Sequence, residues 1–361
     1  MLSLPPGEPL KLVGLALAFA IGACGCSKNG GSSHGWTTAT GGAQDLRCPP
    51  AGPAGGDCAA DLATDPKNCG ACGHDCLGGA CFEGCCEPVT LVTQLYAPER
   101  IVVDAKRAYW TSSPATVKSV SLSGGPVTTI SEDKGPLALT LDATSVYWGG
   151  YGGVAKAPLE GGSPTVLIAE SGSTQSIWGV AVDAEFVYWT DSIAGTLQKV
   201  PLAGGPATVV CSLEGGASAL AIQGKNLYWL DNANLWKVPV GGGAPELIAA
   251  GADNDVGYDL AVDETNAYWT TWKGQVFRMP LDGGEPRGMA HGSAPQEIAV
   301  DAEYIYWTDF LEGTIQRKPI ADDAVSVELA TGQLGATGIA VDDEAIYWTV
   351  RDSHKVMKLA K

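Results

Sequence analysis

A tyrosine–tryptophan pair recurs seven times after about residue 87, and this repeat constrains the fold more than any other feature of the chain. The pairs are Tyr109-Trp110, Tyr147-Trp148, Tyr188-Trp189, Tyr228-Trp229, Tyr268-Trp269, Tyr306-Trp307 and Tyr347-Trp348. Their successive spacings are 38, 41, 40, 40, 38 and 41 residues. A period of about 40 residues with four short strand-like runs per unit is typical of a β-propeller, in which each repeat forms one blade.

A turn with an acidic residue at a fixed position also recurs along the chain. An acidic residue stands five positions before the tyrosine in every unit except one, in which Gln223 replaces it. The acidic residues are Asp104, Asp142, Asp183, Asp263, Asp301 and Asp342. This spacing predicts a hairpin whose second arm carries the Tyr-Trp pair, and we expect the carboxylate to accept hydrogen bonds from turn amides rather than to bind a metal ion.

The two ends of the repeat region complement each other. Residues 88–92 are similar to the fourth strand of a unit, while the sequence stops at Lys361 just after a third strand. We therefore expect the early strand to pair beside residues 355–359 and close the ring, so that no blade is left incomplete. This count favours seven four-stranded blades, and six blades is the alternative.

Two units contain complete tetrads, Tyr188-Trp189-Thr190-Asp191 and Tyr306-Trp307-Thr308-Asp309. Over about three quarters of its length the chain resembles the YWTD β-propellers of low-density-lipoprotein-receptor-type proteins and their bacterial relatives. Propellers of that family generally have six blades, whereas seven units are present here. They mostly bind other proteins, and the resemblance implies the same for this chain.

The N-terminal residues predict export. Residues 1–23 contain one early lysine and a short apolar run that ends at Ile21-Gly22-Ala23-Cys24, which is typical of a bacterial lipoprotein signal whose Cys24 becomes lipidated. A membrane-spanning helix is the alternative, but it needs roughly 20 apolar residues. Residues 24–44 are rich in Gly, Ser and Thr and read as a tether. We expect a lipid-anchored protein of the cell envelope, at the outer membrane or cell surface.

A cysteine-rich module is predicted at residues 45–86, before a propeller at residues 87–361. Its eight cysteines are Cys48, Cys58, Cys69, Cys72, Cys76, Cys81, Cys85 and Cys86. Their even number in an exported segment favours four disulfides over a zinc site, although Cys69 and Cys72 have zinc-ligand spacing. The stretch from Asp65 to Gly73 resembles a small module of secreted myxobacterial proteins. Cys211 lies apart from these and is expected to be a buried free thiol.

A candidate binding site follows from the order of the strands. The variable loops between strands two and three, and between strands four and one, must share one face, where binding usually occurs. Three charged residues at the start of inner strands, Arg100, Asp259 and Glu297, should gather at the channel mouth on this face. We add the aromatic residues and histidines expected there, which are Trp178, Tyr258, Trp272, Phe310, His291 and His354. In the competing interpretation these side chains are structural, with Arg100 paired to an acid.

The composition restricts the function. A net charge of −18 argues against nucleic acid as a partner, and no catalytic, cofactor-binding or metal motif is present. We favour a non-catalytic scaffold for protein, peptide or glycan, over a lyase- or lactonase-type propeller enzyme and over a structural envelope protein. Because a solvated mouth carries no packing, charge reversal at Glu297 or Asp259 is expected to leave stability nearly intact, unless one of them forms a buried pair with Arg100.

Overall fold

The computed structural model describes residues 60–361, apart from residues 114, 133–134, 170–175, 233, 252–254 and 322–323. The signal segment, the tether, the lipidation site Cys24 and the cysteines Cys48 and Cys58 therefore lie outside the described residues. Among the residues described, no helix is both long and apolar enough to cross a membrane.

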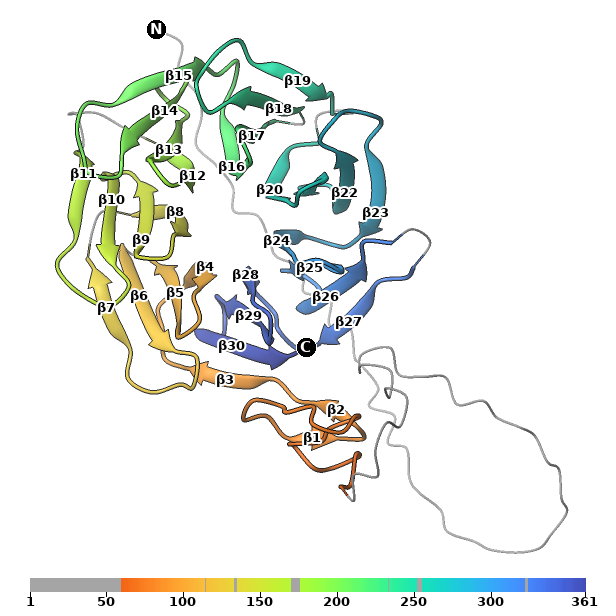
Figure 1. Cartoon of the computed structure of the whole chain (residues 1–361). Coiled ribbons are helices and arrows are strands. Elements are labelled where there is room, and N and C mark those ends of the chain that lie inside the picture. The colour runs from red at the N-terminus through yellow and green to blue at the C-terminus, as the bar shows by residue number, and fades with distance from the viewer. Residues whose placement is uncertain are drawn as a thin grey trace, which may run out of the picture. The chain divides into compact units, whose positions relative to one another are not determined.

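Seven four-stranded antiparallel sheets are arranged around a central axis (Figure 1), which confirms the prediction of a seven-bladed propeller and excludes the six-bladed alternative. The first strand of each blade lies next to the first strands of its neighbours at the centre. We number the blades from the one that contains β4.

The strand bounds are as follows. Blade 1 contains β4 (Pro98–Val103), β5 (Arg107–Ser112), β6 (Thr116–Ser121) and β7 (Thr128–Ser131); blade 2, β8 (Pro136–Leu141), β9 (Ser145–Gly150), β10 (Gly153–Pro158) and β11 (Thr165–Ala169); blade 3, β12 (Ile177–Val182), β13 (Phe186–Asp191), β14 (Thr196–Pro201) and β15 (Thr208–Ser212); and blade 4, β16 (Ala217–Gln223), β17 (Asn226–Asp231), β18 (Asn234–Pro239) and β19 (Glu246–Ala249). Blade 5 contains β20 (Gly257–Val262), β21 (Asn266–Thr271), β22 (Gln275–Pro280) and β23 (Arg287–His291); blade 6, β24 (Pro295–Val300), β25 (Tyr304–Asp309), β26 (Thr314–Pro319) and β27 (Val327–Ala330); and blade 7, β28 (Ala336–Val341), β29 (Ala345–Val350), β30 (Lys355–Ala360) and β3 (Val89–Val92).

The ring is closed by strands from the two ends of the repeat region. β3 pairs antiparallel with β30, with Val89 opposite Lys358 and Thr90 opposite Met357. Leu91 of β3 is buried in the same cluster as Tyr347 of blade 7 and Trp110 of blade 1. The predicted closure is therefore confirmed. Because β3 covers β30, the third strand of blade 7 is not left as an open sheet edge.

The Tyr-Trp pair recurs because adjacent residues of a strand point to opposite faces of its sheet. The tyrosine packs toward the next blade, and the tryptophan packs toward the previous one. Tyr268 of blade 5 shares a core cluster with Trp307 of blade 6, and Tyr306 of blade 6 shares one with Trp348 of blade 7. Each dipeptide thus fills two blade interfaces, which is why it is needed in every unit.

The recurring aspartate has two functions in the turn. In blade 3, Asp183 Oδ1 accepts hydrogen bonds from the main-chain N–H groups of Glu185 and Phe186, at 2.8 and 2.7 Å. This confirms the expected role at turn amides. Its Oδ2 also accepts a hydrogen bond from the Tyr188 hydroxyl at 2.7 Å, which the sequence analysis did not predict. The same tyrosine–aspartate bond is present in blades 1, 2, 5, 6 and 7.

Blade 4 lacks this bond because Gln223 replaces the aspartate, and this difference allows a matched test. We expect Tyr188→Phe to lower the free energy of unfolding by about 1.5–3 kcal/mol, since it removes a partly buried hydrogen bond to a charged group. Tyr228→Phe should change it by less than about 0.5 kcal/mol, because the Tyr228 hydroxyl has no partner among the described residues. Urea unfolding of the two variants measures both values, and equal losses would contradict the proposed role of the bond.

The threonine that follows the Tyr-Trp pair joins neighbouring blades near the channel. Thr308 Oγ1 donates a hydrogen bond to the carbonyl of Thr337 at 2.6 Å, and Thr349 Oγ1 donates to the carbonyl of Glu99 at 2.5 Å. The aspartate that completes the second tetrad, Asp309, accepts a hydrogen bond from the N–H group of Ser293 at 2.8 Å. All four tetrad positions therefore have structural roles in this chain.

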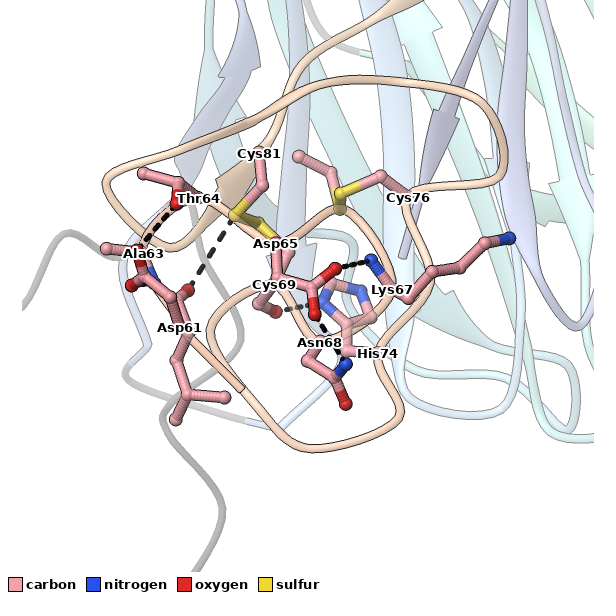
Figure 2. Close-up of a disulfide and its surroundings, with 12 residues drawn as sticks. Asp61, Ala63, Thr64, Asp65, Lys67, Asn68, Cys69, His74, Cys76 and Cys81 are labelled. Atoms are coloured by element: carbon pink, nitrogen blue, oxygen red, sulfur yellow. Dashed lines mark hydrogen bonds between the residues drawn. A yellow bond between two sulfur atoms is a disulfide. The ribbon is translucent and has the colours of Figure 1, made fainter. Parts of the chain in front are cut away.

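The described part of the cysteine-rich module contains two disulfides, Cys69–Cys81 and Cys76–Cys86, and a short hairpin of β1 (Cys81–Phe82) and β2 (Cys85–Cys86). Cys72 and Cys85 are also disulfide-bonded. Figure 2 shows the cysteines among turns held by carboxylates, such as Asp65 Oδ2, which accepts a hydrogen bond from Asn68 Nδ2 at 2.8 Å.

The sulfur atoms of Cys69, Cys76 and Cys86 lie close enough together to hold a metal ion, but all three are oxidised, so they offer no thiolate ligand. This favours the disulfide interpretation of the module over the zinc site. In the propeller, Cys211 is a buried free thiol as expected, and burial raises its pKa to about 11.

Candidate functional site

Two faces of the propeller differ in their connections. In each blade the first-to-second and third-to-fourth turns lie at one end of the strands, because consecutive strands are antiparallel. We call this end the turn face. The second-to-third and fourth-to-first connections lie at the other end, which we call the loop face; an example is residues 192–195 between β13 and β14. All candidate site residues named above belong to the loop face or to the adjacent channel.

Three charged side chains meet at the channel, as the sequence predicted. Arg100 of β4 donates from Nη1 to Asp259 Oδ1 of β20 at 2.7 Å, and its Nε lies 3.1 Å from Glu297 Oε1 of β24. We call these residues the channel triad. The guanidinium reaches from blade 1 to blades 5 and 6 past blade 7.

The two carboxylates of the triad also bond to the neighbouring blades. Asp259 Oδ2 accepts a hydrogen bond from the N–H group of Ile298 in blade 6, at 3.0 Å, and Glu297 Oε2 accepts one from Ile339 in blade 7, at 3.1 Å. Blade 7 can approach blade 1 closely because Gly338 has no side chain. A Cβ atom there would lie only 2.2 Å from the carbonyl oxygen of Glu99.

The triad is buried, which corrects one expectation. Asp259 and Glu297 are only 8% and 7% exposed, so they do not sit at a solvated mouth, and the stated exception of a buried pair with Arg100 applies. The inner strands converge at the channel and exclude water from these positions. Charge reversal at Glu297 or Asp259 is therefore expected to reduce stability, because it would place a cation against Arg100 with little solvent screening.

Burial also changes the acidity of this cluster. It raises the pKa of Glu297 to about 8, the nearby Asp259 charge acts in the same direction, and Arg100 opposes the shift. Two carboxyl groups share one guanidinium here, so a proton on Glu297 would avoid a buried net negative charge.

The predicted aromatic residues differ in how they relate to the triad. The rings of Tyr258, which precedes Asp259, and Trp272 lie 5.8 Å apart, and Trp272 is 70% exposed. Trp178 on blade 3 is also exposed, and its indole N–H group donates to Ser176 Oγ at 2.7 Å. Phe310 is half-buried in the connection between β25 and β26. Of these, Tyr258 and Trp272 extend the site outward from Asp259.

The two histidines are exposed and lie in different blades. His291 ends β23 of blade 5, and His354 lies in the connection that precedes β30 of blade 7. In the part of the chain that the structure describes, no hydrogen bond or ion pair joins either histidine to the channel triad. The structure thus brings Arg100, Asp259, Glu297, Tyr258 and Trp272 together, but gives no such link for the histidines.

The loop face also carries exposed apolar side chains that the sequence analysis mostly missed. Thirteen large hydrophobic residues are exposed among those described, and eight of them lie in or beside the loop-face connections. These eight, which we call the apolar crown, are Tyr96, Tyr151, Trp178, Ile193, Val256, Trp272, Leu311 and Leu334. The signal was present in the sequence as apolar residues within otherwise polar loops.

The fold and this face define the protein's class: a seven-bladed β-propeller with a buried ionic cluster at its channel and an apolar crown on its loop face. No protein-family model matches the chain, and no curated protein matches it in sequence. Comparison with solved structures shows propellers of varied function.

The chain is similar to virginiamycin B lyase from Staphylococcus aureus, in a catalytically inactive form with quinupristin, with a TM-score of 0.65 and 14% identity over 76% of this chain and 98% of that one. The WD40 β-propeller domain of Doa1 has a TM-score of 0.64 and 14% identity, over 76% and 95% of the two chains. The nidogen/laminin complex contains a similar chain with a TM-score of 0.51 and 19% identity, over 60% and 89%. At these identities the similarities establish the fold alone.

Proposed function

We propose that this chain is a non-catalytic binding scaffold and that its loop face takes a protein partner. The apolar crown is the observation that carries the proposal, because eight of the thirteen exposed large hydrophobic residues lie on this one face. Exposed apolar side chains concentrated on one face favour a partner there, and Trp and Tyr are among the residues that most often dominate binding energy. A protein surface covers such a crown better than a polar glycan does.

The resemblance to YWTD propellers supports the same proposal. Two complete tetrads are present, and one of the similar solved propellers was determined in a complex of nidogen with laminin. The strong negative charge of this chain favours a partner whose contact surface is neutral or basic. The channel triad then supplies a rigid, charged centre beneath Tyr258 and Trp272.

A matched pair of variants tests this proposal. We expect Trp272→Ala to reduce recovery of a stoichiometric partner from envelope extract by at least about tenfold, because it removes an exposed aromatic anchor. Leu247→Ala should leave recovery unchanged, since Leu247 is 46% exposed but lies on the outer strand of blade 4, away from the loop face. Quantitative pull-down with the wild type and both variants, all checked for equal melting temperature, gives the comparison.

If the two variants recover the partner equally well, the partner does not bind at Trp272 on the loop face, which would contradict the proposal. Absence of any stoichiometric partner would favour a structural envelope protein instead. A propeller enzyme with its site at the channel mouth is the remaining alternative, and it predicts turnover of a small substrate that depends on the triad or on His291 and His354.

We further propose that the mature protein is anchored in the cell envelope through a lipid on Cys24. The support is the sequence Ile21-Gly22-Ala23-Cys24, which lies outside the described residues. Cys24→Ser should abolish lipid labelling and move the protein from the membrane fraction to the soluble fraction. A serine variant that is still cleaved and still sediments with membranes would refute the anchor.

A further inference from the structure

On the turn face, a second set of contacts joins each blade to the next. Lys156 of blade 2 donates from Nζ to the carbonyl of Leu202 in blade 3 at 2.6 Å, and Lys199 of blade 3 donates to Val240 in blade 4 at 2.8 Å. Arg278 donates in the same way to Ile320 at 2.7 Å, and Lys358 donates to Leu122 at 3.0 Å. In these four blades, a cation on the third strand therefore satisfies a carbonyl at the end of the next blade's third strand.

Blade 4 lacks this contact as well as the tyrosine–aspartate bond. Its third-strand cation, Lys237, instead pairs with Glu246 Oε2 of its own blade at 3.1 Å. The carbonyl of Leu281 in blade 5, which occupies the place of the carbonyls described above, has no partner among the described residues. The Tyr228 hydroxyl is likewise unpartnered, although Tyr228 is only 3% exposed.

The residues that carry these two unpartnered groups line the same hollow at the boundary of blades 4 and 5. In blade 1 the equivalent hydroxyl and carbonyl, of Tyr109 and Leu159, are hydrogen-bonded at 3.3 Å. At blade 4 both groups instead line a hollow of about 560 Å³, together with Gln223, Asn226, Asn266 and Asp282. That volume lies within the range of small-molecule sites, which is roughly 300–1,000 Å³.

The chemistry of the lining restricts the ligand. The Tyr228 O–H group needs an acceptor and the Leu281 carbonyl needs a donor, so a ligand hydroxyl can satisfy both. An anion is disfavoured because Glu264 and Asp282 outnumber the single lining cation, Lys225. The other polar groups of the lining include the side-chain amides of Gln223, Asn226 and Asn266, which are neutral and can both donate to and accept from ligand hydroxyl groups.

We propose that this hollow is a binding site for a neutral saccharide, held through its hydroxyl groups by Tyr228, the Leu281 carbonyl and the side-chain amides of Gln223, Asn226 and Asn266. The site lies on the turn face, opposite the apolar crown, so it does not depend on the proposed protein-binding function. It exists because blade 4 departs from the repeat at Gln223, where the six other blades place a carboxylate against the tyrosine.

The test uses a microarray of neutral glycans, probed with the whole soluble chain, followed by calorimetric titration of the strongest ligand. Tyr228→Phe should weaken glycan binding at least about tenfold, because it deletes only the hydroxyl group from which the ligand accepts a hydrogen bond. Gln223→Asp should weaken it to a similar degree while keeping or raising the melting temperature, since it restores the carboxylate found in the other blades. Tyr188→Phe, in blade 3, is the matched control and should leave glycan affinity unchanged.

Two results would overturn the proposal. The first is that no neutral glycan binds, in which case the hollow holds water only. The second is that a glycan binds and its affinity is the same for the wild type, Tyr228→Phe and Gln223→Asp, which would place the glycan elsewhere on the protein.

Discussion

Trp307→Ala is expected to lower the free energy of unfolding by about 3–5 kcal/mol, one of the two largest effects that we predict for this chain. Trp307 is 1% exposed and packs in one cluster with Tyr268, Ile298 and Ile305, at the interface of blades 5 and 6. Truncation removes buried apolar surface and leaves a cavity, because strands held in two sheets cannot collapse onto the vacated space.

Trp272→Ala is the matched control for this prediction. It makes the same chemical change at a side chain that is 70% exposed, and we expect it to alter the free energy of unfolding by less than about 0.5 kcal/mol. Urea denaturation of the two variants measures the difference. A similar loss for both would mean that burial between blades is not what the Tyr-Trp repeat provides.

Arg100→Met should also cost about 3–5 kcal/mol, because it leaves Asp259 and Glu297 buried without their counter-charge. The loss depends on pH. The pKa of Glu297 is raised by burial, so its folded form favours the protonated state, and its stability contribution is lost as pH rises toward and through about 8. Without Arg100 that pKa rises further, so the loss should be larger at pH 8 than at pH 5.

A charge-free triad is the control for Arg100. Combining Arg100→Met with Asp259→Asn and Glu297→Gln removes the unpaired charges, so the loss at pH 8 should be smaller than for Arg100→Met alone. The triple variant has no titrating group in this cluster, so the cluster should no longer make its free energy of unfolding fall as pH rises from 5 to 8. Unfolding free energies at pH 5 and pH 8 for the wild type, the single variant and the triple variant provide the measurement. A single variant as stable as the wild type at pH 8 would show that the triad does not hold the blades together.

Local and periodic features of the fold were predictable from the sequence. The Tyr-Trp pairs indicated the number of blades because one pair occurs in each repeat. The aspartate five residues earlier indicated the turn because its hydrogen bonds are made within one hairpin. Closure by β3 was predictable for a similar reason: residues 88–92 repeat a fourth-strand pattern, and the last unit lacks one.

The position of the candidate site residues was only partly predictable. The strand order predicts that Arg100, Asp259 and Glu297 lie in the same region, but strand order carries no information on whether solvent reaches them there. Only the convergence of the inner strands, with Gly338 allowing blade 7 to approach blade 1, decided that these charges are buried and paired.

Contacts between blades were decided by the tertiary structure alone. Gln223 was visible in the sequence as the one exception to the aspartate pattern, but its consequence was not. The unpartnered Tyr228 hydroxyl and the Leu281 carbonyl are more than fifty residues apart in the chain, and a hollow between them exists only because two complete blades stand side by side. A repeated sequence therefore determines what each blade is, whereas the packing of one blade on the next determines which side chains are buried, paired or left for a ligand.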